Sequence, residues 1–478
     1  MPAAADARSA LPTALVLLGM AGLCALALAL AAASSLPWLA LALPLTLGGL
    51  LALGLVRAHP LAPLALALVL AGLALNRTAG IQPMEVVFGL YYLGYFAAWY
   101  TLRMLVYRER LVRGVGEGAL AFFMLYMTAA LFLTLLHGGN PGQGLREWIA
   151  LSMLGFYFPV REACERYENG TRLVLLLIVY LGSVSLFRNV LHFQETIVAA
   201  TYAWEVARAR ATSNELILMS AALASLALAA VSRRPAAFLL GVAGFAAFAV
   251  GVVLTQWRAY YVSLALGAAV VFALARGRER RRLGAGALLA VVASTGAAYL
   301  IAGDMLLLLA YGLLDRLLSI GTAGKVDISF LNRLLESRSL WPLVLANPIV
   351  GYGLGTDFAF FDVTTRTTWV KSYAHNGYLT MWYKFGVVGL GALLLFWGSA
   401  IARALRVRAQ PNPWRRAAAL LAAAVLLSLI PSFYVSAPFT TADTVIMFAL
   451  MLGLAAGQPL RPALPPAPGA AMSGSATA

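Results

Sequence analysis

The chain has few charged residues for its length. Of its 478 residues, 11% are Asp, Glu, Lys or Arg and 62% are hydrophobic. A soluble domain of ordinary composition would carry roughly a quarter charged residues. Apolar runs of about 20 residues recur from Leu11 to Gly457, the length at which a helix crosses a bilayer core of roughly 30 Å. The scarcity of charge therefore excludes a soluble enzyme and predicts a polytopic membrane protein.

Cysteine is scarce as well. The chain has two cysteines, Cys24 and Cys164, and they lie in or beside different apolar segments. Neither a disulfide framework nor a cysteine-based metal site is therefore expected.

The apolar runs are rich in Leu, Ala and Gly and do not alternate with polar residues, which favours helices over a β-barrel. The predicted fold class is an all-α polytopic membrane protein, with about 12–14 transmembrane helices and a large helical loop on the outer side. The first run, 11–33, is too long for the apolar core of a signal peptide and is expected to span the membrane. The candidate spans are 11–34, 36–56, 60–76, 83–106, 117–137, 144–161, 172–192, 213–232, 235–255, 259–275, 284–303, 376–402, 416–433 and 439–457.

Positive charge exceeds negative charge, with a formal net charge of +16. The arginines lie in short connections between spans rather than on one soluble face, so nucleic acid is not an expected partner. With the N-terminus in the cytoplasm, most Lys and Arg residues fall on the cytoplasmic side, as in RGRERRR at 276–282. Basic residues therefore set the orientation in the membrane.

This orientation divides the chain into five segments. They are N-terminal transmembrane helices (1–203), central transmembrane helices with outer-face arginines (204–303), an outer loop with amphipathic helices (304–375), C-terminal transmembrane helices (376–457) and a Pro/Ala/Ser-rich tail (458–478). The tail is expected to be disordered in the cytoplasm.

The outer loop is the longest segment that is not uniformly apolar. Apolar residues recur every three to four positions in Phe330–Asn347, which predicts a helix lying on the membrane surface. Asn347-Pro348 is expected to end that helix. The GYGLG run at 351–355 follows a helix rather than a strand, so a flexible turn is favoured over a dinucleotide-binding loop.

Four histidines divide by context. His59, His137 and His192 are expected to be polar helix ends at the membrane interface. His375 stands at the outer start of span 376–402 beside Asn376, a favourable N-cap residue. The positive end of the helix disfavours an imidazolium there, so a neutral ring nitrogen can accept a proton. His375 is the candidate general base, and Asn376 supports it.

Arginine also occurs at membrane depth. Arg258 follows Gln256 where two apolar segments meet at the outer side. A guanidinium there costs a few kcal/mol unless it faces a cavity or an anion. The alternative interpretation is that Arg258 extends to the outer headgroups.

Further outer-face arginines are Arg208, Arg210, Arg333 and Arg338. Each of them alone could be a solvated or headgroup-bound side chain. Together with Arg258 they form an unusual cluster on the face that positive-inside sorting depletes. Guanidinium groups bind diphosphates through paired, charge-assisted hydrogen bonds. The cluster therefore predicts a diphosphate site.

The outer loops contain no DxD or ExD carboxylate pair, and no His/Cys/Glu cluster has metal-ligand spacing. Metal-assisted transfer is therefore disfavoured, and neither a metal nor a cofactor is expected.

Three segments carry a family resemblance: TQWRAYYVSL at an outer helix end, SRSLWPLVLANPIVGYGLG in the outer loop, and YAHNGYLTMWYKFGVVGLG at a helix start. In this order the chain resembles the O-antigen ligase and polymerase superfamily of bacterial inner membranes. The resemblance covers about Ala207 to Gly391. The N-terminal spans match only as hydrophobic helices.

The resemblance implies a multi-pass inner-membrane glycosyltransferase whose active site faces the periplasm. Its donor would be O-antigen linked to undecaprenyl pyrophosphate, and for a ligase the acceptor would be the lipid A-core oligosaccharide. The family's loop histidine falls on His375 and its pyrophosphate-binding arginines fall on Arg258, Arg210 and Arg338. The RAR sequence leaves Arg208 as an alternative to Arg210, and the supporting residues would be Asn376, Gln256, Arg333 and Lys371.

The predicted function is O-antigen ligase, a metal-independent inverting transferase. An O-antigen polymerase or a protein O-oligosaccharyltransferase is the alternative within the enzyme class. A lipid-linked oligosaccharide flippase or a transporter is the alternative of another class. That class would place charges at the midplane in paired broken helices, whereas here the unusual residues gather at one face.

Overall fold

The computed structural model describes residues 61–75, 83–199, 214–302, 328–407 and 410–457. The candidate spans 11–34 and 36–56, the arginines Arg208 and Arg210, and the tail 458–478 lie outside the described residues.

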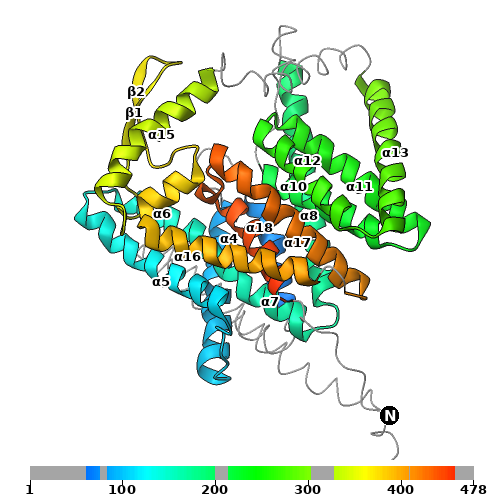
Figure 1. The fold of residues 1–478 in the computed structure, drawn as a ribbon, viewed down its shortest axis with the longest axis horizontal. Coiled ribbons are helices and arrows are strands. Elements are labelled where there is room, and N and C mark those ends of the chain that lie inside the picture. Colours follow the sequence, from blue (N-terminus) through cyan, green and yellow to red (C-terminus); the bar gives the residue numbers. More distant parts are fainter. Residues whose placement is uncertain (1–60, 76–82, 200–213, 303–327, 408–409, 458–478) are drawn as a thin grey trace, which may run out of the picture.

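The described residues are almost entirely helical, which confirms the all-α fold class (Figure 1). The helices of the first half are α3 (Ala62–Ala74), α4 (Pro83–Thr101), the π-turn η1 (Leu102–Val106), α5 (Val115–Leu136), α6 (Pro141–Ser152), the 3₁₀ turn η2 (Met153–Phe156), α7 (Tyr157–Arg166) and α8 (Gly170–Ala199). The second half contains α10 (Glu215–Val231), α11 (Pro235–Leu254), α12 (Arg258–Leu274), α13 (Gly277–Ala302), α15 (Ile328–Ala346), β1 (Phe358–Asp362), β2 (Thr367–Lys371), α16 (Gly377–Val407), α17 (Pro413–Val435), η3 (Pro438–Thr440) and α18 (Ala442–Ala456).

Five of these helices are long and apolar enough to cross a bilayer, namely α5, most of α8, α11, most of α16 and α17. Four shorter apolar helices are α3, α10, α12 and α18. On α5 the large side chains of Leu125 and Phe132 are 73% and 69% exposed, as expected for a helix that faces lipid. The chain is therefore a multi-pass membrane protein.

The candidate span 144–161 is not one helix. The 3₁₀ turn η2 separates α6 from α7, and Tyr100 donates a hydrogen bond from its hydroxyl to the carbonyl of Gly155 at 3.2 Å. A carbonyl bound by a side chain from another helix marks the point where the helix geometry changes.

Helices α17 and α18 occupy the centre of the bundle (Figure 1). The residues of α17 from Ala417 to Leu426 have essentially no exposed surface. Alanine is frequent in this stretch, and small side chains allow neighbouring helices to approach closely. The helices around this centre include α16, α10, α12 and α8.

Two contacts fix the relative direction of α12 and α17. Arg416, near the start of α17, pairs with Glu279, just beyond the end of α12, at 2.6 Å. Further along, Ser263 Oγ of α12 donates to the carbonyl of Ser428 in α17 at 3.0 Å. The two helices are therefore antiparallel, and the start of α12 lies at the same end of the bundle as the end of α17.

The start of α16 is at this end too, because the N–H of Gly377 donates to the carbonyl of Ser436 at 3.0 Å. We call this the loop end, where α12 and α16 begin and α17 ends. The opposite end, where α13 and α17 begin and α16 and α18 stop, is the basic end. Arginines gather there, including Arg161, Arg276, Arg278, Arg280, Arg281, Arg282, Arg403, Arg415 and Arg416.

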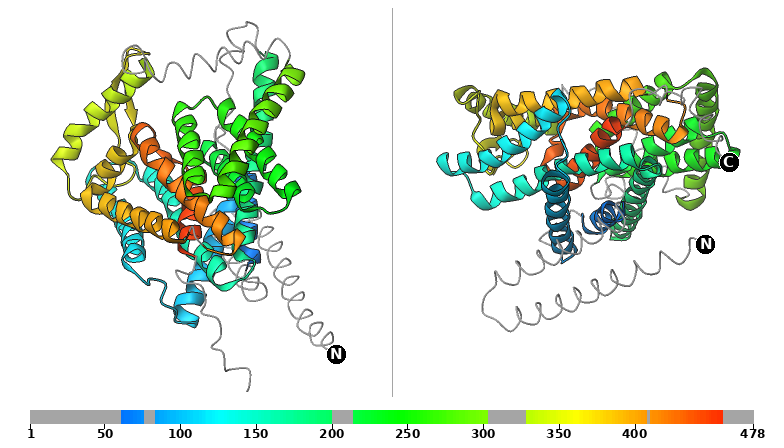
Figure 2. Two further views of the ribbon diagram at one scale, coloured as in Figure 1. Left: turned by 45° about the vertical axis from the view of Figure 1, so that its right-hand side comes forward. Right: turned by 90° about the horizontal axis from the view of Figure 1, so that it is seen from below.

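A β-hairpin at the loop end was not predicted, because the outer loop was expected to be helical. β1 and β2 pair antiparallel from Phe358↔Lys371 to Asp362↔Thr367. Their sequences, FAFFD and TTWVK, contain the aromatic and β-branched residues that favour strands. Asp362 Oδ1 closes the turn by accepting the N–H groups of Thr364 and Thr365. Figure 2 shows α15 and the hairpin standing together at the margin of the bundle.

The GYGLG segment forms a turn after α15 ends at Ala346, as predicted, but it is held in place rather than flexible. Gly353 donates to the carbonyl of Lys384 on α16 at 3.0 Å. Gly355 donates to Glu147 Oε2 on α6 at 2.9 Å and accepts the N–H of Asn140 at 2.8 Å. These hydrogen bonds fasten the loop to α6 and α16.

α16 bends at Gly386, which has φ +61°. A Cβ atom there would fall onto the carbonyl of Ile349. We expect Gly386→Ala to lower the melting temperature of the purified protein, since a left-handed alanine costs about 1–2 kcal/mol before the clash is counted. Gly391→Ala is the matched control, because it adds a methyl to the same helix in open space. Equal melting temperatures for the two variants would contradict this account of the bend.

Candidate functional site

A buried carboxylate organises the loop end. The Glu336 side chain is 2% exposed and accepts three hydrogen bonds. His375 Nδ1 lies 2.7 Å from Oε2, the His375 N–H donates to the same oxygen at 2.9 Å, and Lys371 Nζ lies 3.0 Å from Oε1. We call these three residues the Glu336 cluster. The structure thus brings together two predicted site residues, His375 and Lys371, around a third that was not predicted.

Each member of the cluster comes from a different element. Glu336 lies on the buried face of α15, on one stripe with Leu340 and Val344 at four-residue spacing. Lys371 ends β2, which pairs with β1, and β1 packs on α15. His375 lies in the short connection between β2 and α16. The cluster therefore forms only when helix, hairpin and α16 are assembled.

The start of α16 fixes the backbone around His375. Asn376 is the N-cap, as predicted, because its Oδ1 accepts the N–H of Leu379 at 3.1 Å. The Thr380 hydroxyl lies 3.0 Å from both the N–H and the carbonyl of Ala374. These contacts on both sides of His375 restrict the directions in which its ring can point.

Electrostatics determine which ring nitrogen is available. Burial raises the pKa of Glu336, but the hydrogen bonds from His375 and Lys371 outweigh it and hold that pKa below its usual value. An ionised carboxylate can only accept, so His375 Nδ1 carries a hydrogen. In the neutral ring Nε2 then has the lone pair. With a quarter of the His375 side chain exposed, Nε2 can accept a proton from a bound molecule.

Arg258 is the first residue of α12 and is half-buried. On α12, Arg258 lies five residues, or about 8 Å, from Ser263 in the direction of the loop end. On α17, Ser436 lies eight residues, or about 12 Å, from Ser428 in the same direction. Since Ser263 and Ser428 are in contact, Arg258 and the start of α16 are at similar depth. Gln256, buried and with φ +55°, forms the tight turn before Arg258.

Arg333 and Arg338 lie on α15, the helix that supplies Glu336. Arg333 is half-buried. Arg338 is exposed on the outward face, since residues two apart on a helix point about 200° from each other. Its neighbours on that face, Leu334 and Trp341, are 47% and 45% exposed. Arg338 is thus close to the cluster along the chain but points away from it.

A second ion pair, between α16 and α6, lies near the loop. Lys384 of α16, itself buried, lies 2.7 Å from Glu147 Oε2 of α6. Gln143 Nε2 donates to Glu147 Oε1 at 3.3 Å and to Ser372 Oγ at 3.4 Å. Ser372 directly follows Lys371, so this network ties α6 and α16 to the segment that carries His375.

The sequence analysis missed Glu336 because an acid in an amphipathic helix is normally assigned to the solvated face. The available signal was its spacing. Glu336 shares the i, i+4, i+8 stripe of Leu340 and Val344, whereas Leu331, Leu334, Trp341 and Leu345 lie on the other face and are exposed.

Of the other histidines, His137 caps α5, and its Nδ1 lies 3.1 Å from the carbonyl of Tyr352. His192 lies within α8 instead of ending a span, and His59 is outside the described residues. In the described ranges no group of three or more His, Cys, Asp or Glu side chains is arranged to hold a metal ion.

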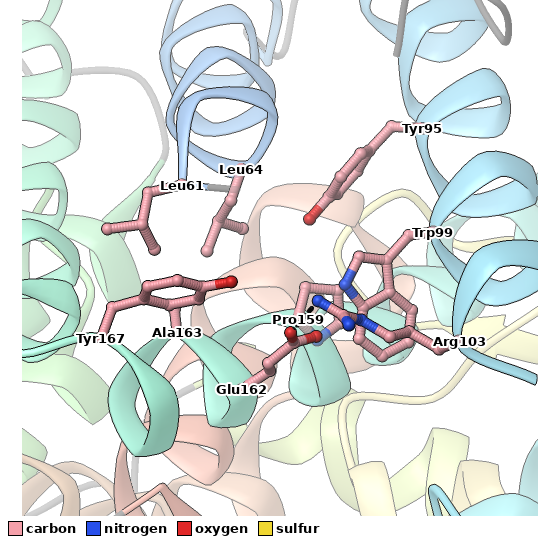
Figure 3. A pocket seen from close by; sticks show the side chains of 9 residues that line it. All are labelled: Leu61, Leu64, Tyr95, Trp99, Arg103, Pro159, Glu162, Ala163 and Tyr167. Carbon is pink, nitrogen blue, oxygen red and sulfur yellow. Dashed lines mark hydrogen bonds and ion pairs between the residues drawn. The ribbon is translucent and has the colours of Figure 1, made fainter. Parts of the chain in front are cut away.

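A pocket at the basic end contains none of the predicted site residues (Figure 3). Arg103 of η1 reaches Glu162 of α7 with one guanidinium nitrogen and Glu109 with another at 3.2 Å. Tyr95 and Trp99 cover the pair from α4. Because the charges bind each other, this pocket joins α4 to α7 and offers no unbalanced charge to a ligand.

Comparison with known proteins gives one family match, and it covers the loop end. Residues 242–394, about a third of the chain, match the family model described as O-Antigen ligase. The matched segment includes Arg258, the Glu336 cluster and the start of α16, but not Arg208 or Arg210. A search of curated proteins found no match to the chain. Members of the matched family are glycosyltransferase-like ligases and polymerases, and residues 242–394 of the chain are similar to that family.

Proposed function

We propose that the protein is an O-antigen ligase. It transfers O-antigen polysaccharide from undecaprenyl pyrophosphate to a sugar hydroxyl of lipid A-core at the periplasmic face of the bacterial inner membrane. The observation that carries this proposal is a histidine with one nitrogen bound to a buried carboxylate and the other available, at the same end of the bundle as Arg258.

In the proposed reaction the acceptor oxygen attacks the anomeric carbon from the face opposite the diphosphate. The new carbon–oxygen bond forms as the bond to the diphosphate oxygen breaks, and undecaprenyl diphosphate leaves with the electron pair. His375 Nε2 takes the proton of the acceptor hydroxyl. Attack from the opposite face inverts the anomeric configuration.

Arginines stabilise the leaving group. Arg258 provides a guanidinium at the start of α12, where the helix dipole adds further attraction for an anion. Arg338, together with Arg208 or Arg210, is assigned to the same diphosphate by family resemblance. Fixed positive groups directed at developing charge are usually the largest contribution to this kind of catalysis.

The outward face of α15 supports entry of the donor from the membrane. Leu331, Leu334, Trp341 and Leu345 are 44–57% exposed and surround Arg338 on one stripe. A helix whose outer face carries large apolar side chains around one arginine fits the boundary between acyl chains and headgroups. A polyprenyl diphosphate has the same two parts, an apolar chain and an anionic head.

The proposed orientation follows from charge. Arginines crowd the basic end, in α13 and at the start of α17, and positive-inside sorting places such residues in the cytoplasm. The loop end, with the Glu336 cluster, then faces the periplasm.

The first prediction concerns the base. We expect His375→Ala to reduce transfer from donor to lipid A-core by about 10²–10⁴-fold, because no other group takes the proton. Donor binding should persist, since the arginines remain. The measurement is product formation by purified protein in detergent, beside donor binding. His192→Ala, an exposed histidine on α8, is the matched control and should retain full transfer. Full activity of His375→Ala would reject the proposed base.

The second prediction concerns the donor. Arg258→Ala should lower kcat/KM for the donor by on the order of 10²-fold, equivalent to losing about 3 kcal/mol of charge stabilisation. Arg258→Lys should recover little, because an ammonium cannot reproduce the two parallel bonds of a guanidinium. Arg278→Ala removes an exposed arginine at the basic end and should have no effect. If lysine restored wild-type turnover, charge alone would be the requirement at this position.

The third prediction separates this mechanism from metal-assisted transfer. Adding a chelator should leave the initial rate unchanged, because guanidiniums supply the positive charge. Inhibition that Mg²⁺ or Mn²⁺ reverses would contradict the mechanism.

In the same assay an O-antigen polymerase would lengthen the donor glycan without lipid A-core, and a flippase or transporter would form no product in detergent.

A further inference from the structure

We infer that Glu336 and Lys371 are positioning residues for the transfer reaction, and that they tune the protonation of His375 in opposite directions. The inference rests on the proposed function, because it assigns roles around the proposed base. It concerns two side chains that touch neither donor nor acceptor in this mechanism.

The first step is geometric. Glu336 Oε2 accepts from both the ring Nδ1 and the backbone N–H of His375, at 2.7 and 2.9 Å. Two bonds from one residue to one oxygen fix the ring relative to its own backbone. The side chain of Glu336 is held in turn by its burial and by Lys371 at 3.0 Å. The ring therefore has one preferred orientation and one preferred tautomer, with Nε2 as acceptor.

The second step is electrostatic. When His375 takes a proton its ring becomes positive, and the Glu336 carboxylate stabilises that charge. Lys371 opposes this effect, because its ammonium lies on the other oxygen of the same carboxylate. The Lys371 ammonium is itself held over the Phe360 ring at 4.8 Å. A buried carboxylate shared by two cations interacts less strongly with each of them.

Other charged groups lie on the elements around the His375 ring. The Tyr373 ring lies 6.0 Å from that of His375. The other charged or titratable side chains on α15, β1, β2 and the first turns of α16 are Glu336, Arg333, Arg338, Asp362, Lys371, Tyr378, Tyr383 and Lys384. Lys384 is bound to Glu147 in a separate pair. Glu336 is thus the acidic group in direct contact with the ring among the described residues.

The test is the pH dependence of kcat/KM for transfer by the full chain in detergent. Glu336→Gln keeps the size of the side chain but removes its charge. We expect kcat to fall about 10²-fold or more, and the acidic limb of the profile to move to lower pH by about one unit. Lys371→Gln should move the same limb to higher pH, since the imidazolium then has the carboxylate to itself.

Glu336→Asp controls for geometry. It keeps the charge and shortens the side chain, so the limb should stay near its wild-type pH while kcat falls. Melting temperatures of all three variants identify any loss of folding. Partial unfolding would not shift the acidic limb of the pH profile to lower pH in one variant and to higher pH in the other. Opposite shifts for Glu336→Gln and Lys371→Gln would therefore support the inference.

Unshifted limbs in both variants, or shifts in the same direction, would overturn it. That failure differs from failure of the proposed function. If His375→Ala abolishes transfer while Glu336→Gln leaves the acidic limb unmoved, only the positioning role is rejected. If His375→Ala remains active, the proposed base is rejected whatever the profiles show.

Discussion

The buried carboxylate of Glu336 is the constraint on which the loop end depends. An ionised group removed from water must be compensated by hydrogen bonds and opposite charge, or the fold loses several kcal/mol. The three hydrogen bonds that it accepts come from a five-residue stretch, Lys371 to His375. α15, the hairpin and the start of α16 must therefore assemble together, and the orientation of the His375 ring is a consequence of satisfying that carboxylate.

The same constraint makes α15 differ from a helix of a soluble protein. Its buried face carries the Glu336 carboxylate beside Leu340 and Val344, and its outer face carries large apolar side chains around Arg338. In water this arrangement would be unfavourable twice, once for each face. In the proposed position at the bilayer surface, lipid would remove the outward leucines and Trp341 from water, and the membrane would help to hold the helix against His375.

The sequence predicted what depends on local pattern. Long apolar runs identified most of the described apolar helices but not the break at η2 within 144–161, and the placement of Asn376 before an apolar run identified an N-cap that the structure confirms. It did not predict the hairpin, the clamp at Gly353 and Gly355, or the role of Glu336. Each of these depends on partners far away in the chain, such as Glu147 for Gly355, and no local periodicity records such a contact. Of the predicted arginines, Arg258 is located at the loop end through the contact between Ser263 and Ser428. Arg208 and Arg210 lie outside the described residues.

The proposed base and the proposed donor-binding arginine are positioned by different parts of the molecule. His375 is oriented by the loop, through Glu336, whereas Arg258 is fixed by the packing of α12 on α17. The two parts meet where Gly377 donates to Ser436, at the junction of α16 and α17. The proposed inverting transfer requires base and leaving group on opposite sides of one anomeric carbon, so in that mechanism the junction must keep its geometry while donor and acceptor exchange. The central part of α17 supports that geometry, because it is close-packed from Ala417 to Leu426 and leaves the helix little freedom to tilt or shift.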